Sequence, residues 1–485
     1  MLGRRQFITS GALALGATLV TSGVSFARTN TATKSRFVFV ILRGALDGLA
    51  AVPPYGDRDY AELRRDLALK APGSPGGVLP LNNLFGLHPS FDFLHESFTA
   101  GELVVFHAVA SPYRERSHFD GQDVLENGNV RPHAVQTGWL NRALTSMPAG
   151  RQPEREMGVA LGQNIPLVMR GSAAVTSWSP SKLAALDDDT LQRITDLYAS
   201  DPLLAKRLAD ALAADAIAGS DQAMAGASPT MNGGDATNGR AASGGPTKGA
   251  AMSGGPTDGA AMSGRFANGA VANGGATNGG VANGGVVNGG VVNGDAGYRD
   301  TQEPALLAKR GKPGARYEEV VNAAAGFLRR DDGPQVAVFD TTGWDTHANE
   351  GSAEGQLAGR LAALDAGLRT LKEQLGPTWN DTAVVLATEF GRTAAVNGTR
   401  GTDHGTGAAA FLVGGAVHGG RVIADWPGLS SRALYQGRDL QPTLDLRSVL
   451  KGVLEEHLLV PSRALDDTVF PDSRSAKAVG GLIRT

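Results

Sequence analysis

The sequence contains no cysteine among its 485 residues. This absence excludes disulfide bonds, thiolate metal sites, thiol nucleophiles and iron–sulfur clusters together. Charged residues make up only 19% of the chain and the formal net charge is -3, so there is no basic excess that would attract nucleic acid. Any metal ion in this protein must therefore be bound by oxygen and imidazole ligands.

Long apolar runs are also missing, except for a modest one at residues 11–20. This run is short and rich in Gly, Ala and Thr, which favours a cleaved signal peptide over a membrane span. It follows the pair Arg4-Arg5 and precedes a small-x-small cleavage pattern at residues 25–27. We interpret residues 1–27 as a signal peptide, either of the twin-arginine type, which it resembles, or an ordinary secretory one. Both alternatives predict a periplasmic or secreted protein with no membrane span after the signal is removed.

Sequence complexity falls sharply between residues 219 and 298, where tandem repeats rich in Gly and Asn occur. Such a composition maximises the entropy of the unfolded chain and offers little surface to bury, so we expect a disordered insertion. Hairpin turns or a calcium-binding β-roll are alternatives, but the acidic residues of such rolls are missing. Loop closure costs only about 0.6 kcal/mol per doubling of length. Residues 28–218 and 299–485 can therefore form one domain together.

Apolar runs and helical patterns alternate along both parts of this domain. Five runs of strand length are apolar at nearly every position, which is typical of strands buried on both faces of a sheet: residues 37–42, 103–109, 336–339, 383–387 and 409–413. Helical periodicity occurs at residues 203–217, 317–328 and 352–375. In the last helix a stripe of leucines is expected to face the core: Leu357, Leu361, Leu364, Leu368 and Leu371. The alternation predicts an α/β fold, a three-layer α/β/α sandwich with a mainly parallel central sheet.

Side chains that can bind metals or act in catalysis lie in the loops next to these runs. The loops read RGALDGL, with Asp47; SPYRERSHFDGQD, with Ser111, Arg114, Ser117 and His118; GWDTH, with Asp345 and His347; TEFGRT, with Glu389 and Arg392; and GTDHGTG, with Asp403 and His404. Four of these loops follow a predicted strand, and the fifth directly precedes one. Ligands of open α/β sheets gather beyond the carboxyl ends of the strands, so we expect the loops to form one site.

The pair Asp345 and His347 gives the most direct indication of a metal site. Residues two positions apart lie on one side of an extended segment, where a carboxylate and an imidazole can both face one ion. Trp344 precedes the pair and is expected to pack under the loop, holding Asp345 in position.

The motifs LRGALDGL, RSHFDGQD, GWDTHANEG, ATEFGRT and GTDHGTG resemble those of an exported bacterial family catalogued as domain of unknown function 1501. That family is grouped with the alkaline-phosphatase-like superfamily of phosphatases, sulfatases and cofactor-independent phosphoglycerate mutases. The resemblance covers nearly the whole chain outside the signal and the repeats. It implies a fold that binds two metals across the strand ends, with a hydroxyl nucleophile opening a helix.

The resemblance also implies roles for individual residues. The matched positions are Asp47 for the aspartate after the first strand, Asp345 and His347 for an acid–histidine pair whose spacing is shortened here, and His404 for a late histidine. The departure is in TEFG, where the superfamily usually has Asp-His. Glu389 can supply an oxygen there, but Phe390 cannot bind a metal, which puts the second metal in doubt.

We therefore expect one or two divalent ions, which oxygen and imidazole ligands allow to be zinc, manganese, calcium or magnesium. The expected ligands are Asp47, Asp345, His347, His404, Glu389 and His118. His107 lies inside a predicted strand and is expected to be a core imidazole. The other histidines have no acidic companion in their loops and are expected to be structural or solvated: His88, His95, His133, His418 and His457.

Ser117 is the first candidate for a nucleophile, followed by Ser111, because Ser117 precedes a predicted helix at residues 118–126 whose N-terminal amides would face an anion. The alternative is that Ser117 is only the N-cap of that helix. Arg114 and Arg392 are candidates for binding a phosphate or sulfate group, or alternatively form surface ion pairs.

Two classes of function follow. The first is a metal-dependent hydrolase of a small phosphoric ester, or less favourably a sulfuric ester. Sulfatase chemistry is disfavoured because the chain has no cysteine and because ASPYR places Ala110 where serine-type sulfatases have their nucleophile. The second is a catalytically degenerate, exported metal-binding scaffold that acts through a protein partner of the cell envelope, which Phe390 favours.

Overall fold

The computed structural model describes residues 35–148, 157–162, 164–180 and 315–484, together with single positions between residues 194 and 209. The four ranges belong to one compact unit. The predicted signal peptide, the insertion at residues 219–298 and most of the helix predicted at residues 203–217 lie outside the described residues.

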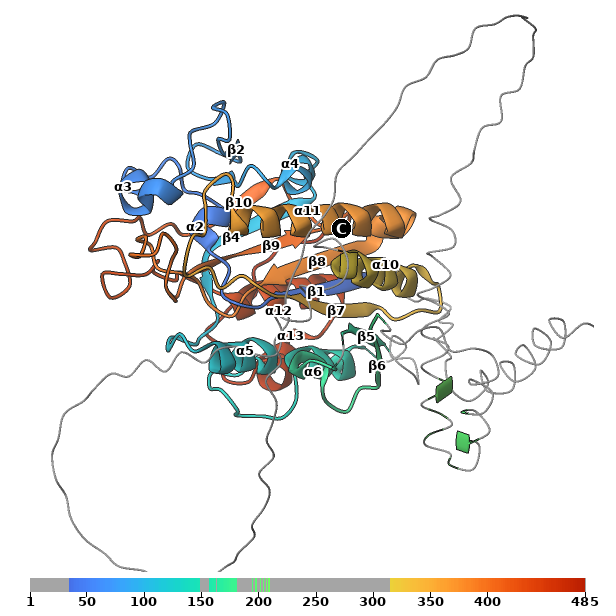
Figure 1. The fold of residues 1–485 in the computed structure, drawn as a ribbon. Coiled ribbons are helices and arrows are strands. Elements are labelled where there is room, and N and C mark those ends of the chain that lie inside the picture. The colour runs from blue at the N-terminus through green and yellow to red at the C-terminus, as the bar shows by residue number, and fades with distance from the viewer. Residues whose placement is uncertain are drawn as a thin grey trace, which may run out of the picture. The chain divides into compact units, whose positions relative to one another are not determined.

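A nine-stranded sheet forms the centre of this unit (Figure 1). Its strands follow the order β10-β4-β9-β8-β1-β7-β5-β6, and β11 also pairs with β4. The strand β9 is antiparallel to β4 and β8, and the remaining pairs of the sheet are parallel. The strands are β1 (Arg36–Leu42), β4 (Leu103–Ala110), β5 (Gly158–Leu161), β6 (Val175–Trp178), β7 (Val336–Thr341), β8 (Thr382–Ala387), β9 (Ala408–Val413), β10 (Arg421–Ile423) and β11 (Leu444–Asp445), with a separate hairpin of β2 (Leu79–Pro80) and β3 (Gly86–Leu87). The predicted α/β class, the mainly parallel sheet and all five predicted strands are confirmed.

Helices cover both faces of the sheet. On one face lie α4 (Asp92–Thr99), α10 (Ala315–Arg329) and α11 (Gln356–Leu375), and on the other lie α5 (His118–Asn127), α6 (Trp139–Ser146) and α12 (Leu446–His457) (Figure 1). The shorter helices are α2 (Gly48–Ala51), α3 (Tyr60–Arg64), α13 (Ser462–Ala464), the 3-10 helices η1 (Arg65–Leu67), η2 (Leu167–Met169) and η3 (Gly376–Asp381), and the π-helix η4 (Leu465–Val469). No helix among the described residues is both long and apolar enough to cross a membrane.

The strand β1 shows why the apolar runs of the sequence are continuous. Its residues alternate between two separate cores: Phe37, Phe39 and Ile41 pack on one face of the sheet, and Val38, Val40 and Leu42 pack on the other. All six side chains are fully buried. A strand covered by helices on both sides has no polar face, so the period-two alternation of an exposed strand is absent.

The helix α11 carries the predicted leucine stripe. Each of its five leucines is no more than 1% exposed and belongs to the core on that face of the sheet. The helix begins at Gln356, four residues later than predicted, and Gly355 before it has a φ of 130°, outside the helical region.

His107 and His457 are core imidazoles with satisfied hydrogen bonds. His107 Nε2 lies 3.0 Å from the carbonyl of Val52, and its Nδ1 accepts from the amide of Ala108. His457, at the end of α12, lies 2.8 Å from the carbonyl of Arg36 at the start of β1. Burial lowers the pKa of each imidazole to about 4. The prediction for His107 is confirmed, and His457 is structural.

A pH-dependent loss of stability follows from these depressed pKa values. The unfolded chain binds the proton near pH 6.5, so the stability is present above that pH and is lost as the pH falls towards 4, by about 3 kcal/mol per histidine. His457→Gln keeps a donor for Arg36 without titrating. We expect the difference in unfolding free energy between wild type and His457→Gln, measured with urea, to shrink by about 3 kcal/mol from pH 7 to pH 4. The same replacement of exposed His418 is the control, and a pH-independent difference for His457→Gln would contradict the argument.

Candidate metal centre

The topology brings four of the predicted loops to one edge of the sheet. The strands β1, β4, β7 and β8 share a direction, so their carboxyl ends lie together. The antiparallel β9 begins at this same edge, which places the loop in front of it beside the loops that follow the other strands. This orientation explains how His404, which precedes its strand, joins residues that follow theirs.

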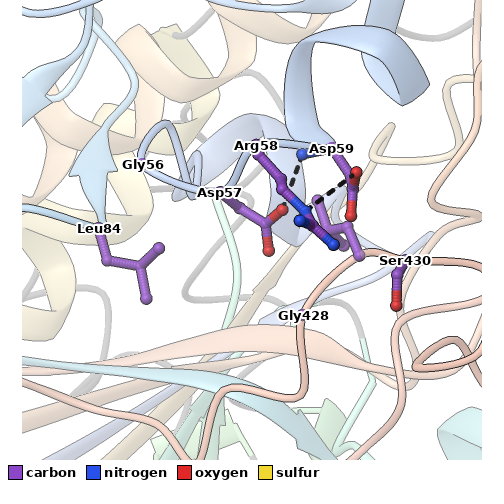
Figure 2. A pocket seen from close by; sticks show the side chains of 8 residues that line it. Gly56, Asp57, Arg58, Asp59, Leu84, Gly428 and Ser430 are labelled. Atoms are coloured by element: carbon purple, nitrogen blue, oxygen red, sulfur yellow. Dashed lines mark hydrogen bonds and ion pairs between the residues drawn. The ribbon is translucent and has the colours of Figure 1, made fainter.

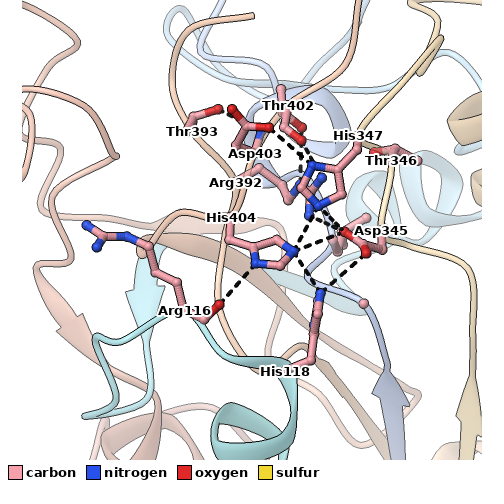
Figure 3. Close-up of polar contacts among 12 residues, drawn as sticks. Arg116, His118, Asp345, Thr346, His347, Arg392, Thr393, Thr402, Asp403 and His404 are labelled. Carbon is pink, nitrogen blue, oxygen red and sulfur yellow. Dashed lines mark hydrogen bonds and ion pairs between the residues drawn. The ribbon is translucent and has the colours of Figure 1, made fainter. Parts of the chain in front are cut away.

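Four predicted ligands meet at this edge: His118, Asp345, His347 and His404 (Figure 3). The Nε2 atom of His404 lies 2.9 Å from that of His118 and 3.0 Å from that of His347. Asp345 Oδ1 lies 3.1 Å from His347 Nε2 and 3.3 Å from His404 Nε2, and its Oδ2 lies 3.5 Å from His118 Nε2. Atoms of His118, Asp345 and His404 are all close enough to hold one metal ion.

The second nitrogen of each imidazole faces an acceptor. The pairs are His404 Nδ1 with the carbonyl of Arg116 at 3.0 Å, His118 Nδ1 with Glu389 Oε1 at 2.8 Å, and His347 Nδ1 with Asp403 Oδ1 at 3.1 Å. A carbonyl or carboxylate oxygen can only accept, so each Nδ1 carries the hydrogen. The neutral tautomer then has its lone pair on Nε2. The Nε2 atoms of His118 and His347 each lie beside that of His404. Histidines that bind metals are held by such carbonyl and carboxylate partners.

The charges around the cluster favour a cation at its centre. Burial opposes ionisation of Asp345, but hydrogen bonds from the three imidazoles and the charge of Arg392 hold the pKa of its carboxyl well below the usual range. Although burial lowers the pKa of His118, hydrogen bonds to Asp345 and Glu389 raise it to about 9. The same negative charges that hold a proton on an imidazole nitrogen also stabilise a metal ion there.

The cluster is open to solvent. The side chains of Asp345 and His347 are 41% and 43% exposed, whereas those of His118 and His404 are 23% and 27% exposed. Structural metal sites are usually closed by protein ligands, and catalytic sites keep a position for water or substrate. The exposure therefore fits a centre that a small molecule can reach.

An aromatic wall closes one side of the cluster. The ring of Phe390 lies 5.0 Å from the ring of His118 and 5.4 Å from that of His404, measured between centroids. Gly121 of α5 makes this approach possible, because a Cβ there would lie 2.8 Å from the Phe390 ring. The residue that cannot bind a metal thus packs directly on two that can.

Glu389 lies behind His118, and its prediction as a metal ligand is corrected. Its Oε1 accepts from the amide of Gly44 at 2.8 Å and from Gln122, and it faces His118 Nδ1. Its Oε2 lies 2.9 Å from the hydroxyl of Thr388. The carboxylate therefore faces the Nδ1 side of the His118 ring and orients that ring. Gly44 also lets the Asp345 loop approach, because a Cβ at its φ of 118° would lie 2.8 Å from the Asp345 amide.

Asp47 is also placed apart from the cluster, so its prediction as a ligand is corrected. Its Oδ1 caps α2 by accepting from the amides of Leu49 and Ala50, and its Oδ2 forms an ion pair of 2.6 Å with Arg64. Arg64 is fully buried and also lies 3.4 Å from Glu350. The positive partner of the Asp47 carboxylate is therefore the Arg64 guanidinium and not the predicted metal ion.

The two candidate arginines have different partners from those predicted. Arg392 has a fully buried side chain whose Nη1 lies 2.6 Å from Asp345 Oδ1, so it forms neither a surface ion pair nor an accessible clamp for substrate. Arg114 donates to the carbonyls of Tyr113 and Ser111 in its own loop. The prediction of anion binding is therefore corrected for Arg392, and it stays a prediction for Arg114.

The two serines predicted as nucleophiles, Ser117 and Ser111, lie in different surroundings. Ser117 occupies the N-cap position of α5, next to His118, but its hydroxyl makes no capping hydrogen bond. Its role as a nucleophile stays a prediction. Ser111 is buried, with 4% of its surface exposed, and its hydroxyl donates to the carbonyl of Glu389 at 3.4 Å.

Sequence reasoning missed several functional partners. Asp403 lies directly before His404 in the sequence, but its contact with His347 Nδ1 was not predicted. Glu350 is in the quoted motif GWDTHANEG, but no spacing rule indicated that it is buried. Arg64 had no sequence signal. His133 was expected to lack acidic companions, yet its ring lies 3.3 Å from both Asp120 and Asp123.

A separate surface hollow lies away from the predicted residues (Figure 2). It is lined by Gly56, Asp57, Arg58, Asp59, Leu84, Gly428, Leu429 and Ser430, none of which was predicted to act in the site. The carboxylate of Asp57 already accepts from the Trp426 indole at 2.9 Å and from the Asp59 amide at 2.9 Å.

Comparison with known proteins gives a match to a protein family. Residues 298–469 match the model of a family described as protein of unknown function (DUF1501), in agreement with the resemblance of the motifs. This segment includes Asp345, His347 and His404, whereas His118 lies outside it. No curated protein and no solved structure matches the chain.

Proposed function

We propose that the chain binds a single divalent metal ion through His118, Asp345, His347 and His404. The observation that carries the proposal is the convergence of three Nε2 atoms on one carboxylate, while each Nδ1 is held by an acceptor. In the absence of a cation, two facing Nε2 atoms at 2.9 Å can be reconciled only when one of them is protonated. A metal ion held by His118, Asp345 and His404 would remove this conflict, and His347 Nε2, 3.0 Å from His404 Nε2, would be the fourth ligand.

The donor set narrows the identity of the ion. Calcium and magnesium prefer six or more oxygen ligands, including water, whereas three imidazoles and one carboxylate suit zinc, manganese or another transition metal. Of the four ions expected from the sequence, we therefore favour zinc and manganese.

We infer further that the centre hydrolyses a small phosphoric ester. A divalent ion would supply Lewis acidity that polarises the ester oxygen. His118 is the first residue of the ten-residue helix α5, so the partial positive charge of the helix N-terminus lies beside the cluster and favours an anionic substrate. Ser117, next to His118, is the nucleophile candidate. The resemblance to the alkaline-phosphatase-like superfamily and the signal-like N-terminus support an exported hydrolase of that kind.

A catalytically degenerate metal-binding scaffold is the second proposal. Phe390 occupies one wall of the cluster, Glu389 is turned towards His118, and Arg64 neutralises Asp47. Because of these three features, the residues expected for a second metal are not available, and only the ligands of a single metal ion remain. A scaffold of this kind would act through a protein partner of the cell envelope.

Metal content and ester hydrolysis separate the two proposals. We expect about one equivalent of zinc or manganese in protein purified without chelator, measured by plasma mass spectrometry. A hydrolase should cleave an aryl phosphate monoester or diester, lose this activity with chelator, and regain it when the metal is restored.

The outcomes differ clearly. Metal without hydrolysis of either ester would favour the scaffold. Protein that binds no transition metal under saturating conditions would contradict both proposals. Hydrolysis that persists without metal would contradict the proposed chemistry of the hydrolase.

A further inference from the structure

Buried polar side chains connect the metal centre to the loop of Thr402, and Figure 3 shows Arg392 between Thr402 and Asp345. Glu350 Oε2 accepts from the hydroxyls of Thr346 and Thr402, each at 2.9 Å. Thr402 Oγ1 in turn accepts from Arg392 Nε at 3.2 Å, and Arg392 Nη1 donates to Asp345 Oδ1 at 2.6 Å. Glu350, Thr346, Thr402 and Arg392 are all no more than 3% exposed, so water does not compete for these bonds.

The direction of each hydrogen bond in this row is fixed. Arg392 has only donors, so the Thr402 oxygen must accept from it. The single hydroxyl hydrogen of Thr402 is then left for Glu350. The carbonyl of Thr402 also accepts from Arg392 Nη2, so Thr402 contacts the guanidinium through two separate acceptors. A planar group held at two atoms keeps one orientation.

Asp345 depends on an external partner for its own orientation. It lies in the irregular segment between β7 and α11 and is 41% exposed. Its Oδ1, the oxygen that Arg392 contacts, is also the oxygen nearest to His347 and His404. Rotation of this carboxylate would remove the oxygen from the point where the imidazoles converge.

We propose that Thr402 is a positioning residue of the metal centre, which holds Arg392 so that Asp345 Oδ1 faces the ion. The proposal rests on the metal centre proposed above, and it does not depend on the reaction catalysed there. Glu350 completes the arrangement by taking the Thr402 hydrogen. Partners that orient metal ligands in this way affect metal affinity by about 10-fold to 100-fold when they are removed.

Cobalt binding by the full chain tests the proposal. Thr402→Val keeps the shape of the side chain but loses the hydroxyl, and Thr402→Ser keeps the hydroxyl. Thr382→Val is the matched control, because Thr382 is equally buried and its hydroxyl donates to the carbonyl of Thr378 at 2.7 Å, outside the metal centre. We expect Thr402→Val to weaken Co²⁺ binding about tenfold and to change its visible absorption spectrum. Thr402→Ser should restore both properties, and Thr382→Val should leave both as in wild type.

Two results would overturn the positioning role: an unchanged affinity and spectrum in Thr402→Val, or equal changes in Thr402→Val and Thr382→Val. Melting temperatures of the variants show whether an effect is a general loss of stability, which would affect both valine variants alike. Wild-type protein that does not bind Co²⁺ would contradict the metal centre itself. Failure of the centre and failure of the positioning role are thus distinguishable.

Discussion

Replacement of Asp345 by alanine should abolish metal binding and ester hydrolysis together. Asp345 is the only carboxylate among the four proposed ligands, and its oxygens lie within 3.5 Å of all three Nε2 atoms. Without it, three imidazoles and the buried guanidinium of Arg392 would surround the ion, and the Arg392 charge would repel it. Loss of the several kcal/mol that a metal provides to a transition state corresponds to a rate reduction on the order of 10³-fold.

The experiment needs a control for charge and one for folding. Asp332→Ala removes an exposed carboxylate that pairs with Arg330, and it should leave the metal content and the rate unchanged. Asp345→Asn keeps the shape of the side chain and should also lose the metal, which separates loss of a ligand from loss of packing. Retention of one equivalent of metal in a folded Asp345→Ala protein would show that the centre lies elsewhere. Retention of hydrolysis by metal-free Asp345→Ala would remove the enzymatic proposal.

Replacement of Arg64 by methionine should cause the largest loss of stability. Arg64 is fully buried, and its Nη2 lies 2.6 Å from Asp47 Oδ2. The charge of Arg64 holds the pKa of the Asp47 carboxyl below its usual value despite burial, which means that Asp47 is ionised. Removal of one partner leaves an uncompensated buried charge, so we expect the unfolding free energy to fall by about 3–5 kcal/mol. Urea unfolding at pH 7 measures this loss.

Two comparisons identify its cause. Arg330→Met removes a guanidinium that is 43% exposed, and it should cost no more than about 1 kcal/mol. Burial and the neighbouring Asp47 raise the pKa of Glu350 to about 8, so Glu350→Gln replaces a neutral carboxyl at pH 7 and should be tolerated much better than Arg64→Met. A loss in Arg64→Met as small as that in Arg330→Met would show that Asp47 does not depend on this ion pair.

The sequence predicted those elements best whose residue pattern results directly from burial in the core. Residues 37–42 of β1 are all apolar because helices cover both sides of the sheet. The leucines of α11 repeat at the spacing of one helical face, which packs on the sheet. Such patterns reflect contacts that any compact α/β fold requires. They predicted the fold class and five of the nine strands of the sheet, and the loops next to these strands contained the four proposed ligands.

The apolar pattern of the sequence could not predict the roles of individual carboxylates. Asp47, Asp345 and Glu389 all follow strands at the same edge of the sheet, yet only Asp345 faces the three imidazoles. Asp47 is turned to Arg64, a residue with no sequence signal, and Glu389 is turned to His118. The neighbours that each carboxylate meets in the folded chain decide whether it faces the imidazoles, orients a histidine or pairs with an arginine.

The sequence by itself determined an α/β chain without thiol chemistry, with imidazole and carboxylate groups collected at the ends of its strands. Only the tertiary structure decided which of these groups converge, because convergence depends on the antiparallel direction of β9, which places His404 at the shared edge, and on buried partners such as Arg392, which pairs with Asp345. The physical reason is that burial follows from local composition, whereas the pairing of charges depends on contacts between different loops, such as that between His118 and Glu389, which are 271 positions apart.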